Sequence, residues 1–152
     1  MKKRNIILIA VIVIIVIIQF IFTGKPEVIE NNPDDLLTTA KVPDHINNIL
    51  RTSCYDCHSN ETRYPWYSHV APVSWLIISD IREGRDHLNF SDWNHLNKMQ
   101  QAKFLGDIID EVSHDEMPLK PYTMMHTNAR LTKENRKEIV DWANAYGDSL
   151  FK

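Results

Sequence analysis

Two cysteines, Cys54 and Cys57, are the only ones in this 152-residue chain, and His58 follows the second directly. Two thiols and an imidazole at this spacing can hold a haem, contribute to a zinc site, or act as a redox dithiol. In a C-x-x-C-H pattern both thiols lie on one side of a helical turn, where they can add to the vinyl groups of one porphyrin. The spacing predicts one covalently attached haem c per chain, with His58 as the proximal ligand of its iron.

Zinc and redox-dithiol chemistry are less compatible with the rest of the chain. A structural zinc site needs four ligands, and none of the seven histidines forms the H-x3-5-H pair that would complete two cysteines. A thioredoxin-like dithiol is expected in a βαβ context, whereas this chain has mostly helical periodicity. A disulfide between residues this close would constrain too short a loop to stabilise the fold much. A non-haem metal-binding or structural module stays open as an alternative.

A second iron ligand is predicted at Met117, which is followed by Pro118 and stands fifteen residues before Thr132. Class I cytochromes c carry a methionine on a loop before the C-terminal helix, and a thioether ligand favours reduced iron. The alternative interpretation is that Met117 fills a gap in the core, which is a common use of methionine. Other candidates for this distal position are Met124, Met125, His126 and His69.

Aromatic and basic side chains follow the motif in the stretch "RYPWY", residues 63–67. A partly buried haem propionate must be paired with hydrogen-bond donors. We therefore predict Arg63, Tyr64 and Trp66 as further cofactor-binding residues. Core filling is the competing interpretation, and for Trp66 it is the favoured one.

Helices are predicted to position these residues, because apolar side chains recur at helical spacing and no segment alternates like a strand. The first helix begins at Asp44 and runs into the motif. A second covers residues 73–82 and ends near Gly84 as a C-cap. Ser91 and Thr132 are predicted to cap two further helices. The fold class is therefore all-α, a small helical domain around one haem, which the family resemblance described below implies to be cytochrome c-like.

Residues 6–22 form an apolar run, interrupted only by Gln19, behind the basic residues at positions 2–4. Seventeen helical residues are near the lower limit for crossing a hydrocarbon core of about 30 Å. A cleaved signal peptide is the alternative, but no small-x-small pair follows the run. The pattern predicts a bacterial inner-membrane protein with a periplasmic C-terminal domain. Its parts are a cytoplasmic end (1–5), a transmembrane signal anchor in contact with lipid (6–22), a linker (23–42) and a haem-binding domain (43–152).

Charge excludes one class of partner. Three of the 17 Lys and Arg precede the apolar run, so 14 remain against all 20 Asp and Glu. A domain with this acidic excess lacks the basic face of a nucleic-acid binder.

The motif, together with the stretches "YPWY", "NFSDW" and "MPLKPY", resembles the bacterial haem-binding-domain family, whose members are small membrane-anchored or fused proteins similar to cytochrome c. The resemblance extends from about Asp44 to Tyr146 and implies covalent haem binding.

These expectations combine in a mono-haem, cytochrome-like electron carrier that needs no catalytic residue and exchanges electrons with redox protein partners. If Met117 does not bind iron, the distal position is open, and a haem-based sensor or a peroxidase-like accessory becomes the alternative. A bacterial cytochrome-type peroxidase would usually carry a second C-x-x-C-H, which this chain lacks.

Overall fold

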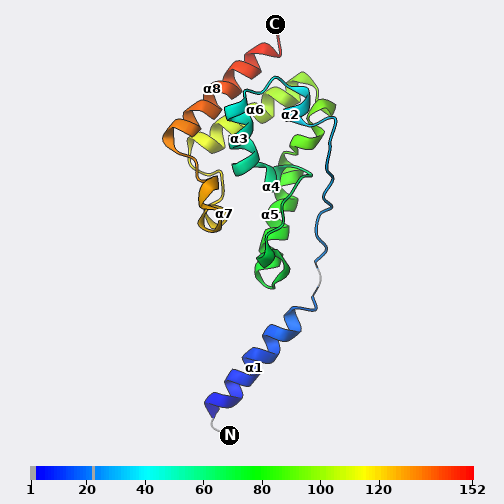
Figure 1. Ribbon diagram of the computed structural model, residues 1–152, viewed down its shortest axis with the longest axis vertical. Helices are drawn as coiled ribbons and strands as arrows, with labels where there is room; N and C mark the ends of the chain where they lie inside the picture. The colour runs from blue at the N-terminus through cyan, green and yellow to red at the C-terminus, as the bar shows by residue number, and fades with distance from the viewer. Residues whose placement is uncertain (1–2, 22) are drawn as a thin grey trace.

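A computed structural model describes residues 3–21 and 23–152. The described residues form helices, turns and loops, with no strand among them. Figure 1 shows α5 and α7 projecting on either side of α4, with α1 extending away from the other helices. The α-helices are α1 (Lys3–Ile18), α2 (Leu36–Thr39), α3 (Asp44–Ser53), α4 (Tyr55–His58), α5 (Val73–His87), α6 (Lys98–Ser113), α7 (Lys120–Met125) and α8 (Lys133–Ser149). Short 3-10 helices are η1 (Trp66–His69), η2 (Phe90–His95) and η3 (Thr127–Ala129).

The predicted transmembrane helix is wrong. Within residues 3–21 and 23–152, every helix falls short of the length and apolar character needed to cross a membrane. The 16 residues of α1 extend about 24 Å, and beyond them the amide of Gln19 donates to the carbonyl of Ala71 and accepts from its N–H. This finding also contradicts the predicted single-pass location in the inner membrane. Phe22 and residues 1–2, to which those predictions extended, lie outside the described residues.

Residues 23–35, which belong to the predicted linker (23–42), run along α5 in an extended conformation (Figure 1). Side chains of the helical domain donate hydrogen bonds to carbonyls of this segment: the Tyr64 hydroxyl to Pro26 at 2.9 Å and Arg85 Nη1 to Glu27 at 2.9 Å. At its far end Asp35 and Leu36 are buried. The segment is therefore hydrogen-bonded to the domain at Pro26 and Glu27 and buried at its far end, while residues 27–31 are exposed.

The hydrophobic core is a cluster of buried side chains from α2, α3, α4, η2, α6 and α8, in which α6 packs against α8. Trp93 is buried, and its indole N–H donates to the Tyr146 hydroxyl at 3.0 Å. The other fully buried members include Leu36, Ile46, Leu50, Tyr55, Phe90, Leu105 and Ala143. This core holds the C-terminal end of α3, and with it the start of the C-x-x-C-H motif.

Helix boundaries agree with the sequence at α8 and differ at two other places. Thr132 caps α8 in a capping box with Asn135, as predicted. The predicted C-cap at Gly84 is wrong, because α5 continues to His87 and Gly84 is buried against the motif. The predicted cap at Ser91 is also wrong, because Ser91 lies inside η2 while Asn97 caps α6.

Candidate functional site

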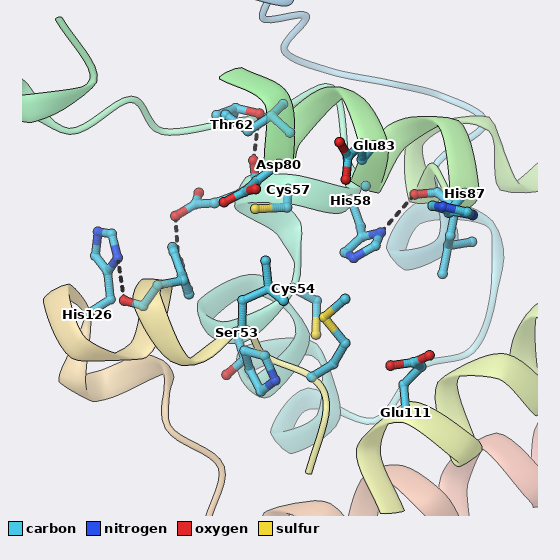
Figure 2. A pocket seen from close by; sticks show the side chains of 18 of the residues that line it. Ser53, Cys54, Cys57, His58, Thr62, Asp80, Glu83, His87, Glu111 and His126 are labelled. Carbon is cyan, nitrogen blue, oxygen red and sulfur yellow. Dashed lines mark hydrogen bonds between the residues drawn. The ribbon is translucent and has the colours of Figure 1, made fainter. Parts of the chain in front are cut away.

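A cavity of about 630 Å³ contains the side chains of the C-x-x-C-H motif. Figure 2 shows Cys54, Cys57 and His58 pointing into this space. Residues of α3 to α7 line it, and most of the lining is apolar, including Leu50, Ile77, Ile81, Phe90, Phe104, Ile108, Val112, Leu119 and Leu131. Such a cavity is within the size range of small-molecule and cofactor sites.

The two cysteines lie where α3 passes into α4. Cys54 ends α3 and precedes α4, and Cys57 lies within α4. Neither forms a disulfide. Burial raises the pKa of each thiol to about 12, and the charge of Asp56 adds to this effect at Cys57. Both thiols are therefore neutral at ordinary pH and face an apolar space.

The imidazole of His58 is held in one orientation. Its Nδ1 lies 3.1 Å from the carbonyl oxygen of Leu88, just beyond the end of α5. Because a carbonyl can only accept, Nδ1 carries the proton and Nε2 keeps a free lone pair. Burial lowers the pKa of His58, although the hydrogen bond to Leu88 opposes this. The ring is thus neutral, which is the form that ligates a metal.

Gly84 lets α5 pass close to the motif. A Cβ at this position would lie 2.8 Å from the carbonyl oxygen and 3.2 Å from the carbonyl carbon of Cys57. Backbone atoms cannot move aside as a flexible side chain can. The absence of a side chain at Gly84 therefore sets the distance between α5 and α4.

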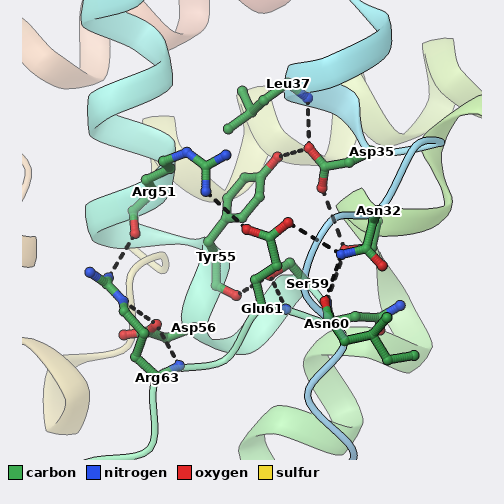
Figure 3. Close-up of polar contacts among 12 residues, drawn as sticks. Asn32, Asp35, Leu37, Arg51, Tyr55, Asp56, Ser59, Asn60, Glu61 and Arg63 are labelled. Atoms are coloured by element: carbon green, nitrogen blue, oxygen red, sulfur yellow. Dashed lines mark hydrogen bonds and ion pairs between the residues drawn. The ribbon is translucent and has the colours of Figure 1, made fainter.

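Asp56, between the two cysteines, is 9 % exposed and receives hydrogen bonds on both oxygens. Oδ1 accepts from the backbone N–H of Arg63 at 3.2 Å and from its Nε at 3.1 Å. Oδ2 accepts from the Tyr122 hydroxyl at 2.8 Å. Figure 3 shows the Arg63 contacts beside a second group, in which buried Asp35 accepts from the hydroxyl of Tyr55. Both residues between the cysteines are thus fixed by side chains from elsewhere in the chain.

The far side of the cavity is formed by residues 117–126, here called the α7 arm. Met117 is half-buried and lines the cavity, with its N–H 3.3 Å from the Glu111 carbonyl and its own carbonyl 3.4 Å from Arg136 Nη1. Met125 and His126 line it too. His126 Nε2 lies 3.1 Å from the Tyr67 hydroxyl, and its Nδ1 lies 3.3 Å from the Tyr122 carbonyl oxygen.

The predicted site residues divide into two groups. Cys54, Cys57, His58, Arg63 and Met117 all line the cavity. Tyr64 and Trp66 are outside its lining: the Tyr64 hydroxyl is bonded to the Pro26 carbonyl, and Trp66 is 76 % exposed. Core filling by Trp66 is therefore wrong. Among the other distal candidates, Met124 and His69 are exposed and outside the lining as well.

Residues that sequence reasoning missed are Asp56, Gly84 and Tyr122. Only Asp56 carried a local signal, since it stands inside the motif. Carboxylates that α5 and α6 contribute to the cavity wall were missed too, namely Asp80, Glu83, Asp107 and Glu111. In the described ranges, no group of three or more His, Cys, Asp or Glu side chains is arranged to hold a metal ion.

A family model described as a haem-binding domain covers residues 13–145, from within α1 to within α8. No curated protein and no solved structure matches the chain.

Proposed function

Because the chain belongs to the family of haem-binding domains, we propose that it binds one haem c covalently through Cys54 and Cys57, with His58 as the proximal ligand of the iron. The observation that carries this proposal is that both thiols and the imidazole line the same apolar cavity. Cys57 and His58 lie within α4 and Cys54 directly precedes it, so the three side chains could bind one planar ligand together.

The residues present fit such a group. The cysteines are free, the histidine is neutral with Nε2 available, and the cavity volume of about 630 Å³ is that of a cofactor site. The apolar lining would exclude water. Arg63 also lines the cavity, and its guanidinium donates through Nε to Asp56 and through Nη2 to the Arg51 carbonyl. When bound, the haem supplies a one-electron redox centre whose potential depends on axial ligand, burial and hydrogen bonding.

We further propose Met117 as the distal ligand, which would make the protein an electron carrier that exchanges electrons with redox protein partners. Met117 supports this because it lines the cavity and its backbone is held at both the N–H and the carbonyl. His126 is a poorer candidate, because both of its ring nitrogens are within hydrogen-bond distance of other groups. A Met/His pair is the ligation found in cytochromes c.

Covalent attachment is tested by expressing the full chain in a host with working c-type cytochrome maturation and staining a denaturing gel for haem. We expect a stained band for the wild type and none for the Cys54→Ser, Cys57→Ser double variant. An unstained wild-type band would refute the attachment proposal.

Distal ligation is tested by the optical spectrum of the ferric protein before and after Met117→Ala. Met124→Ala is the matched control, because Met124 lies on the same arm but is 71 % exposed and outside the cavity lining. We expect the sulfur-to-iron charge-transfer band to vanish only in Met117→Ala. A band unaffected by Met117→Ala would refute the ligand assignment, and a wild type without the band would favour an open distal site and a sensor or peroxidase-like role.

A further inference from the structure

The α7 arm carries four candidate iron ligands, of which Met117, Met125 and His126 line the cavity. Two of its side chains also form hydrogen bonds with residues outside the arm. Tyr122 donates to Asp56 of the motif at 2.8 Å, and His126 bonds to Tyr67 of η1 at 3.1 Å. We propose that Tyr122 is a positioning residue that ties the α7 arm to the turn bearing the cysteines, and so determines how firmly the arm closes the distal side. This inference rests on the proposed function, in which the haem lies between that turn and the arm.

The hydrogen-bond partner of Tyr122, Asp56, is itself held in place, so this bond fixes the position of the arm relative to the motif. Asp56 stands between Cys54 and Cys57, and its second oxygen is held by the N–H and Nε of Arg63. The carboxylate therefore cannot turn toward another donor without losing those bonds. The Tyr122 hydroxyl also lies 3.4 Å from the Thr52 carbonyl oxygen at the end of α3. The Tyr122 hydroxyl thus connects the arm to both α3 and α4, the helices on which the motif lies.

The two cross-cavity bonds differ in strength. A hydrogen bond to a carboxylate is roughly twice as strong as one between neutral groups, and a carboxylate that is 9 % exposed has little water to replace a lost donor. Burial and the charge of Asp56 hold the pKa of Tyr122 well above its ordinary value, so the phenol remains a donor. The Tyr67–His126 hydrogen bond joins the arm to η1 and does not involve the turn that bears the cysteines.

The test compares Tyr122→Phe with Tyr67→Phe. Each substitution removes one phenolic hydroxyl and with it one of the two hydrogen bonds that hold the arm. On the ferric haem-loaded full chain we measure the apparent affinity for imidazole, which can bind iron only when the arm opens. The apparent affinity scales with the open fraction, so we expect it to rise about tenfold in Tyr122→Phe and only about twofold in Tyr67→Phe. Amide hydrogen exchange of residues 117–126, measured on the same full chains made without haem, should be faster in Tyr122→Phe.

Several results would overturn the inference. Wild-type imidazole affinity in Tyr122→Phe would overturn it, even if exchange in the arm were faster, because the bond would then hold the arm without governing access to the iron. An equal rise in Tyr67→Phe would show that the arm has no preferred attachment to the motif. A wild type that carries no covalent haem would refute the proposed function instead, and unchanged exchange in the haem-free Tyr122→Phe chain would still refute the role of Tyr122.

Discussion

Replacing Gly84 with alanine tests whether the close approach of α5 to the motif is required. The new Cβ would lie 2.8 Å from the carbonyl oxygen of Cys57, 3.2 Å from its carbonyl carbon and 3.3 Å from its Cβ. Two of these atoms belong to the backbone, so α5 and α4 must separate by several tenths of an ångström. Overpacking of this kind costs about 1–3 kcal/mol. Alanine also favours a helix over glycine by about 0.5–1 kcal/mol, which masks part of the loss.

A matched control isolates the clash. Gly106 lies within α6, and a Cβ there would meet nothing within 4 Å. Gly106→Ala should therefore show the helix gain alone, while Gly84→Ala shows the gain and the clash together. The free energies of unfolding of the two variants should differ by about 1–3 kcal/mol, which corresponds to melting temperatures about 2–12 °C apart for a chain of this size.

The assay is urea and thermal unfolding followed by far-ultraviolet circular dichroism, on both variants and the wild type. A second readout is the haem spectrum. The Leu88 carbonyl that orients His58 lies just past the end of α5, and the Leu88 N–H donates to the Gly84 carbonyl. Moving α5 should therefore disturb His58, the proposed proximal ligand, as well as the fold. If Gly84→Ala is as stable as Gly106→Ala, the contact between α5 and Cys57 is loose and the reasoning fails.

Three smaller predictions concern residues away from the cavity. Burial raises the pKa of Asp35 above its ordinary 3.8, so the folded state binds the carboxyl proton more tightly than the unfolded state does. The free energy of unfolding therefore falls as pH rises from about 3.8 toward the raised pKa. Asp35→Asn removes the titrating group and should abolish that fall. The melting temperature of the variant relative to the wild type should therefore be higher at about pH 7 than at about pH 4, and an equal difference at both pH values would contradict this. Leu105→Ala, at a site only 1 % exposed, should lower the free energy of unfolding by about 2–5 kcal/mol in urea titrations. Thr132→Ala should cost about 1 kcal/mol through loss of the α8 cap, whereas Thr132→Ser, which keeps the acceptor oxygen, should be close to wild type.

Features that depend on neighbouring residues could be predicted from the sequence. The apolar spacing around Asp44 and the Thr132 cap each correspond to an observed helix start. The end of α5 could not be placed, because a glycine that terminates a helix and a glycine that admits a neighbouring backbone look the same in one sequence. Length and composition also suggested a membrane-spanning helix, yet α1 ends at Ile18.

The sequence by itself determined which residues share the motif turn, because the C-x-x-C-H spacing sets their positions on one helical turn. It also predicts Met117 as a ligand, from its type and its place before the last helix, and Met117 lines the cavity. Only the tertiary structure decided what surrounds them. Gln19 bonds to Ala71 across 52 positions, and Tyr122 bonds to Asp56 across 66. Contacts over such distances leave no local pattern, since they depend on how whole helices pack and not on the residues beside each partner.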